Sequence, residues 1–252
     1  MFVIRALLVF IFVVHGSSSL AQNLNMQDHS VGGPFYYNRA LPETLFYIGE
    51  IGPEDFDLFQ SINKKIKIKT LVLFSPGGVV KEALDIAYFV NKKQISTLVP
   101  KNAICLSACA FIFFGGPERL AVGELGVHQI SFNDEVNRRK KRIGEITKQS
   151  QEVVADIIAA LNVFDTPPFV FEKMFETLEM YYFSSTEKDI LNVSKYAFNA
   201  TRTEELEGHL LNFLKTVKTE PAKKEGYDFP PLIDIGKCLA SLGRLSMLTC
   251  IK

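Results

Sequence analysis

The sequence predicts an α/β domain with a largely parallel sheet, and three observations support this. Short β-rich runs alternate with helical runs between residues 44 and 100. Strand, helix, strand, helix and strand in that order are typical of such a domain. Two loops of small residues follow strands, at the edge where α/β sheets bind their ligands. We therefore expect the chemistry of this protein to lie at those two loops.

The alternating elements follow one another from residue 44. In the first helical run, Phe56, Phe59 and Ile62 recur at helical spacing after acidic residues, which favour a helix N-terminus. The runs TLFYIGEIG and ISTLVP are β-rich, and LVLF is apolar throughout. The predicted elements are a strand at 44–52, a helix at 53–66, a strand at 71–74, a helix at 79–93 and a strand at 95–100.

On both sides of this core the sequence changes character. Residues 22–42 are polar and contain Gly32-Gly33-Pro34, so we expect a mobile lead-in. After the core we expect helical structure at 133–161, a break at DTPPF and a second helical piece. From residue 202 onward the sequence predicts a charged amphipathic helix, a linker at 219–231 and a short tail. The predicted organisation is a domain at 43–201 and a C-terminal extension at 202–252.

The N-terminus has the composition of a secretory signal peptide. Arg5 precedes the apolar run at 6–14, and small polar residues follow up to Ser19-Leu20-Ala21. The alternative is an uncleaved anchor, but the run is far shorter than the roughly 20 apolar residues that a membrane-spanning helix needs. We expect residues 1–21 to be removed after Ala21, leaving a soluble protein in the periplasm or outside the cell.

Charge gives no reason to expect a nucleic-acid partner. The chain has 28 Lys and Arg against 28 Asp and Glu, so its net charge is zero. The basic cluster RRKKR at 138–142 is local, and a solvated helix start explains it better than a phosphate-binding patch.

The four cysteines are Cys105, Cys109, Cys238 and Cys250, and they allow three pairings. Cys238 and Cys250 close a short tail, which favours a disulfide in an exported protein. Cys105 and Cys109 are then a second local disulfide or two buried free thiols. A cysteine nucleophile is a further reading, because thiolates at helix N-termini have a lowered pKa. Zinc binding is disfavoured, since no second cysteine pair or HExxH motif lies nearby.

Three short motifs carry the candidate chemistry. The loop SPGG at 75–78 follows a buried strand, and its glycines can leave amide groups exposed to hold an oxyanion, although an ordinary turn would look the same. Ser107 lies 29 residues after Gly78 and starts the small run SACA, where it is either a nucleophile or a plain helix cap. His128 follows in the apolar run ELGVHQI. A lone histidine there is usually a core residue, but beside a nucleophile it is a general base.

The stretch FSPGGVVKEALDIAYFVNKKQISTLVPKNAICLSACAFIFFGG, followed by GVHQ, resembles the Clp-type serine proteases of the ClpP/crotonase fold. It is most similar to their exported, ATPase-independent branch. The resemblance runs from about residue 44 to 197 and includes LFYIGEIGPEDFDLF. It implies repeated β-β-α and βαβ units. It also implies Ser107 as nucleophile, His128 as base, and the amides of Gly78 and Ala108 as the oxyanion hole.

The sequence departs from the family at the third catalytic residue. Relatives have an aspartate at this position, whereas EMYYFSS places Met180 there. Glu179 is the nearest substitute, and Asp165 is a second candidate. Loss of the carboxylate behind a catalytic histidine can cost about 10⁴ in turnover. The alternatives are another group supporting His128, a Ser-His dyad, or a weak enzyme.

The resemblance therefore implies an exported, ATP-independent serine hydrolase, a peptidase that needs no cofactor and acts on peptides or unfolded proteins. Relatives assemble into rings through the segment after the histidine, here 133–161, which implies a homo-oligomer. The main alternative is a catalytically weak or silent protein that binds peptides in the same cleft. Acyl-CoA chemistry of the crotonase type is disfavoured by export, and GVHQ favours a histidine over the Ser-Lys dyad of signal-peptide-peptidase relatives.

Overall fold

The structure is a computed structural model that describes residues 30–129, 143–176 and 178–216. Its strands are β1 Ser30–Gly32, β2 Phe35–Tyr37, β3 Thr44–Ile48, β4 Thr70–Phe74, β5 Ser96–Val99, β6 Ile104–Leu106, β7 Arg119–Ala121, β8 Glu124–Val127 and β9 Tyr181–Tyr182. Its helices are α1 Asp55–Lys65, α2 Val80–Lys93, α3 Ala108–Gly115, α5 Ile143–Val163, α6 Phe169–Glu176, α7 Ser185–Leu191 and α8 Ala200–Thr216.

These elements form an α/β fold around a mixed, mostly parallel sheet. One sheet has six strands in the order β1-β2-β3-β4-β5-β7, and the other has three in the order β6-β8-β9. Pairing is parallel from β3 through β4 and β5 to β7. The predicted α/β class with a largely parallel sheet and the predicted alternation of strands and helices between 44 and 100 are confirmed. The apolar run of β4 is buried along four of its five residues, as expected for a central parallel strand.

The sheet begins earlier than the sequence predicts, so the expected lead-in at 22–42 is wrong from residue 30 onward. Strands β1 and β2 form an antiparallel hairpin, and β2 pairs with β3. Phe35 explains why this segment is ordered: its ring is fully buried, stacks on the Phe59 ring at 5.5 Å and meets the Tyr47 ring edge-to-face at 4.9 Å. The hairpin turn is Gly33-Pro34, between Gly32 and its partner Phe35, and Gly32 and Gly33 both have the positive φ that glycine adopts readily.

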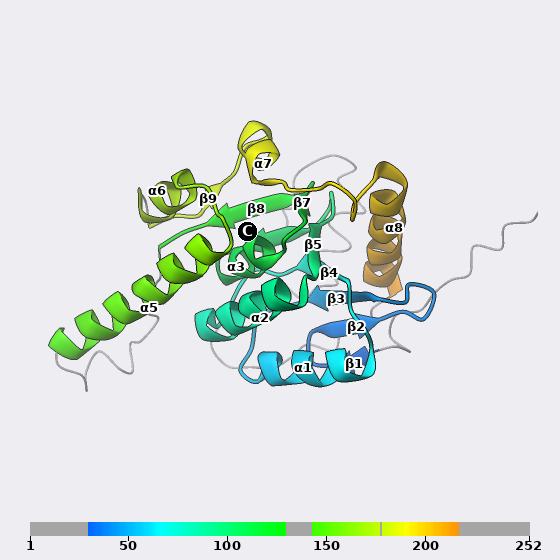
Figure 1. The fold of residues 1–252 in the computed structure, drawn as a ribbon, viewed down its shortest axis with the longest axis horizontal. Coiled ribbons are helices and arrows are strands. Elements are labelled where there is room, and N and C mark those ends of the chain that lie inside the picture. Colours follow the sequence, from blue (N-terminus) through cyan, green and yellow to red (C-terminus); the bar gives the residue numbers. More distant parts are fainter. Residues whose placement is uncertain (1–29, 130–142, 177, 217–252) are drawn as a thin grey trace, which may run out of the picture.

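The predicted boundary at residue 202 falls inside helix α8, which belongs to the main core. Leu206 and Leu210 are fully buried, and the Phe213 ring lies 4.5 Å from the Tyr36 ring of β2. In Figure 1 this helix, drawn in orange, stands beside strands β2 and β3. The amphipathic helix is therefore confirmed, but it is not part of a separate extension.

Several expectations fall outside the described residues. They concern the signal peptide at 1–21, the basic cluster at 138–142, the start of the helical region at 133–142, the linker at 219–231 and the pair Cys238 and Cys250. Within the described ranges, no helix is long and apolar enough to cross a membrane.

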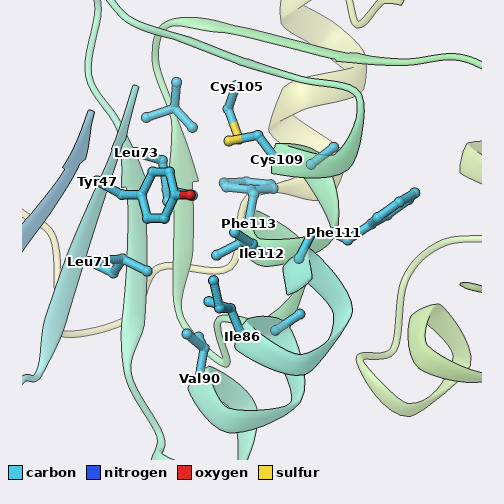
Figure 2. Packing of buried hydrophobic residues seen from close by; sticks show 14 of the residues in the cluster. Tyr47, Leu71, Leu73, Ile86, Val90, Cys105, Cys109, Phe111, Ile112 and Phe113 are labelled. Atoms are coloured by element: carbon cyan, nitrogen blue, oxygen red, sulfur yellow. A yellow bond between two sulfur atoms is a disulfide. The ribbon is translucent and has the colours of Figure 1, made fainter. Parts of the chain in front are cut away.

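Helix α3 forms the centre of the core. All eight of its residues, ACAFIFFG, are buried, which is typical of a helix enclosed on every side. Figure 2 shows Phe113 and Ile112 lying between strand residues such as Leu73 and the residues Ile86 and Val90 of α2. A helix packed in this way fixes the position of its own first turn, which matters because that turn adjoins Ser107.

Arg119 is a buried cation that joins three parts of the fold. Its side chain is 5 % exposed and donates to the backbone oxygens of Phe114, Gly116, Phe164 and Leu191, at 3.0–3.3 Å. These oxygens lie at the ends of α3, α5 and α7. Buried carbonyl groups need partners, so one guanidinium satisfies several chain ends at once.

Arg119→Met should lower the free energy of unfolding by about 3 kcal/mol, because it leaves buried carbonyl oxygens without donors. The matched control is Arg202→Met. Arg202 is partly exposed and bonds Thr44 and Glu205, so its loss should cost no more than about 1 kcal/mol. Urea denaturation of both variants checks this. Equal losses in the two variants would contradict the role given to Arg119.

Candidate active site

Ser107 occupies a sharp turn between strand β6 and helix α3. Its φ of 55° and ψ of −126° lie where few residues other than glycine are found. Strained backbone of this kind costs about 1–3 kcal/mol and clusters at functional sites. A serine on a strained strand-to-helix turn presents its hydroxyl outward, as in the nucleophile elbow of hydrolases. The turn is held in place because the Ser107 amide donates to the Gly126 oxygen at 3.0 Å.

His128 lies directly beside this serine. Its Nε2 is 2.7 Å from the Ser107 Oγ, which is hydrogen-bonding distance. His128 follows the last residue of β8, and β8 pairs in parallel with β6, which ends one residue before Ser107. The two side chains therefore meet because two adjacent parallel strands end at the same edge of their sheet. This is the geometry that a serine and a general base require.

Burial makes His128 a base that stays neutral at physiological pH. The ring is half-buried, and this desolvation lowers the pKa of His128 below its ordinary 6.5. Among the described residues, no carboxylate hydrogen-bonds the ring or raises its pKa. Neutral imidazole can accept the hydroxyl proton through Nε2.

The peptide unit between Gly77 and Gly78 lies against the serine. A Cβ on Gly77 would be 2.7 Å from the Ser107 Cβ and 3.1 Å from the Ala108 nitrogen, so only glycine fits. Both glycines have positive φ, at 106° and 143°. The buried Ser75 hydroxyl accepts the Gly77 amide at 3.1 Å and closes the turn.

Two backbone amides, those of Gly78 and Ala108, lie close to Ser107. The Gly77 oxygen accepts from the Ile51 amide at 2.8 Å. Because C=O and N–H of one trans peptide point in opposite directions, the Gly78 N–H faces away from Ile51, on the side where Ser107 approaches. Ala108 is the first residue of α3, so its amide has no acceptor within the helix. These are the two amides that the sequence predicts for an oxyanion hole.

A disulfide joins the residues on either side of the serine. Cys105 in β6 and Cys109 in α3 are bonded, with their Cα atoms 5.1 Å apart, and both are fully buried. The predicted local disulfide is thus confirmed for this pair, and the alternatives of free thiols or a cysteine nucleophile are excluded. Figure 2 shows the sulfur bridge beside Phe113, at the end of the apolar core. The bridge connects the strand and the helix that present Ser107.

Neither predicted substitute for the third catalytic residue reaches His128. Glu179 is exposed and makes no bond to the ring. Asp165 is also exposed, and its charge acts on Arg119 instead. Tyr181 pairs with Val127 in the antiparallel β8–β9 ladder, so Met180 is next in register and lies opposite His128. The Met180 sulfur would be 3.2 Å from a Cβ built on Gly126. Residues 126 and 128 are two apart on one strand, so their side chains lie on the same side of the sheet.

The sequence reasoning missed two residues that shape the site. The motif SPGG contains Gly77 as well as Gly78, but the resemblance assigns a role to Gly78 alone. Ile51 was placed only within a predicted strand, yet its backbone holds the Gly77–Gly78 peptide. No local signal identifies Ile51, because its role depends on a contact with a loop 26 residues further along the chain.

A search with the sequence finds no matching protein-family profile and no match among curated protein sequences. The described residues also hold no group of three or more histidine, cysteine, aspartate or glutamate side chains that could bind a metal ion. The site consists of a serine, a histidine whose pKa is lowered by burial, and two backbone amides beside the serine.

The rate at which Ser107 reacts with a fluorophosphonate should follow the titration of His128. Because burial lowers the pKa of His128, we expect the rate to be constant at neutral pH. It should fall on acidification with a midpoint below 6.5, where the imidazole becomes protonated. Inactivation rates measured from pH 4 to pH 9, roughly the range over which histidine titrates, check this. A midpoint above 6.5 would contradict it and would indicate a carboxylate acting on the ring.

Proposed function

We propose that this chain is a serine hydrolase that cleaves peptides through a Ser107–His128 dyad. The observation that carries the proposal is the 2.7 Å contact between Ser107 Oγ and His128 Nε2 on a strained turn. A serine hydrolase needs a nucleophile, a base and a site for the developing negative charge. Here we assign that site to the amides of Gly78 and Ala108. Together these are the parts that acyl transfer needs.

The proposed reaction has two steps. His128 Nε2 takes the Ser107 proton while Oγ attacks the substrate carbonyl carbon, and the amides of Gly78 and Ala108 stabilise the resulting oxyanion. The protonated imidazole then gives its proton to the leaving amine, which departs and leaves an acyl-serine. Water, activated by the same histidine, hydrolyses the ester and restores the serine.

Further parts of the proposal rest on the sequence resemblance. We assign the chain to the ClpP/crotonase fold and to the exported branch of the Clp-type proteases, acting in the periplasm or outside the cell. Without an ATP-driven unfoldase, its substrates are peptides or already unfolded proteins. Assembly into a homo-oligomer through the region that includes α5 belongs to the same proposal. The mostly parallel α/β sheet supports this assignment at the level of fold class.

A second candidate function is peptide binding without turnover. The observation that favours it is Met180, which lies opposite His128 where relatives carry an aspartate. Without a carboxylate the imidazolium formed during the reaction is not stabilised, and its tautomer is not fixed. The two functions share one cleft and differ in the rate of acylation.

Ser107→Ala should abolish labelling of the protein from residue 22 onward by a fluorophosphonate probe, since it removes the only attacking oxygen. The matched control is Ser61→Ala. In the wild type the Ser61 hydroxyl donates to the Leu58 oxygen on helix α1, so this variant should be labelled like the wild type. His128→Ala should slow labelling by at least about 10³-fold, because the general base is lost. Intact mass spectrometry measures the added phosphonyl group.

Labelling that persists in Ser107→Ala would overturn the hydrolase proposal. Labelling of the wild type without cleavage of a peptide library would favour the binding function. Cleavage products that disappear in Ser107→Ala would establish the peptidase.

Met180→Asp should raise the acylation rate by about 10- to 1000-fold, because it places a carboxylate beside His128 across the β8–β9 ladder. The control is Met180→Asn, which has the same shape without the charge and should give little gain. The same change should raise the pH midpoint of the reaction. Single-turnover labelling kinetics measure both effects, and equal rates for the two variants would contradict the dyad interpretation.

A further inference from the structure

The orientation of the Gly78 amide depends on a loop outside the motifs already discussed. The Ile51 amide donates to the Gly77 oxygen at 2.8 Å, and the Ile51 oxygen accepts from the Val79 amide at 2.9 Å. A Cβ on Gly78 would lie 2.8 Å from the Ile51 nitrogen, so the two backbones are in direct contact. Any movement of Ile51 must therefore move the Gly77–Gly78 peptide.

Two hydrogen bonds hold the loop around Ile51, one at Gly49 and one at Gly52. The Gly49 amide donates to the Phe74 oxygen at the end of β4, at 3.0 Å. The Gly52 amide donates to the Asp55 carboxylate at 2.7 Å. The first bond ties the loop to the sheet, and the second ties it to the first residue of α1.

The Asp55 carboxylate is itself fixed by a buried tyrosine. The same oxygen that accepts the Gly52 amide accepts the Tyr47 hydroxyl at 2.5 Å. Tyr47 is fully buried in β3 and Asp55 is 6 % exposed. Burial, with the adjacent carboxylate, raises the pKa of Tyr47, so it remains a donor at any pH of interest. Hydrogen bonds to a charged acceptor are about twice as strong as neutral ones.

We propose that Asp55 is a positioning residue for the oxyanion hole. The Asp55 carboxylate, held by Tyr47, fixes Gly52 and hence Ile51. Ile51 in turn orients the Gly77–Gly78 peptide, whose N–H we assign to the oxyanion hole. Asp55 does not touch the substrate and takes no part in proton transfer. The inference rests on the proposed function, because it assigns a purpose to the Gly78 amide in that reaction.

The test compares Asp55→Asn and Tyr47→Phe with the control Asp57→Asn. Asp57 lies on the same helix but is exposed. In fluorophosphonate inactivation of the full protein, we expect both test variants to lose about 10- to 100-fold in the maximal rate, since small misplacements can cost that much. The probe's half-saturating concentration should stay within about two-fold, because only the transition state uses the amide. Asp57→Asn should match the wild type.

A second readout does not depend on activity. The Gly78 amide resonance, followed by ¹⁵N NMR, should move in Asp55→Asn and Tyr47→Phe and stay in place in Asp57→Asn. If the wild type is not labelled but Gly78 moves, the proposed function fails while the coupling of Asp55 to Gly78 stands. An unmoved Gly78 resonance, or a maximal rate like that of the wild type in a folded Tyr47→Phe protein, would overturn the inference.

Discussion

The candidate site depends on the backbone contact between three segments that are far apart in the sequence. Ile51, the Gly77–Gly78 peptide and the Ser107 turn lie side by side, with the glycine segment in the middle. Ser75 bonds Ile104 and Leu106 on one side, and Gly77 bonds Ile51 on the other. This arrangement leaves one amide of the central segment directed at the serine. It also explains why both middle residues are glycines, because a side chain at either would strike a neighbouring backbone.

A rigid support surrounds this contact. The Ser107 backbone is strained, and such a conformation persists only when its surroundings hold it. Helix α3, which follows Ser107, is fully buried, and the Cys105–Cys109 disulfide ties its first turn to strand β6. Arg119 anchors the other end of α3 through carbonyl groups of Phe114 and Gly116. Ser107 is therefore supported by a packed apolar helix, a disulfide and buried hydrogen bonds.

The histidine has a different environment from that of a complete triad. Desolvation lowers the pKa of His128, and no carboxylate among the described residues offsets it. Such an imidazole is neutral at pH 7 and can accept a proton, but its protonated form has no carboxylate to stabilise it. In the proposed reaction, this would slow the steps in which His128 carries a positive charge. Met180 occupies the position from which a carboxylate would correct this.

Sequence alone determined the parts of this protein that depend on local patterns. Alternating strand and helix periodicity predicted the central α/β elements, and short motifs located Ser107, His128 and Gly78. Periodicity and turn chemistry are properties of neighbouring residues, so they can be read without a structure. The hairpin of β1 and β2 was missed because each strand is only three residues long and the segment is interrupted by Gly33-Pro34; its order comes from Phe35 packing on Tyr47 and Phe59.

Only the tertiary structure decided which side chains meet. It paired Cys105 with Cys109, and it gave the His128 ring a hydrogen bond to Ser107 and no carboxylate influence on its pKa among the described residues. It also brought Ile51 into contact with the Gly77–Gly78 peptide, and Asp55 into contact with Gly52. Contacts of this kind are set by strand register and helix packing across the whole chain, and a shift of one residue turns a side chain to the opposite face. The sequence located the candidate serine and histidine, and the fold determined which residues support them.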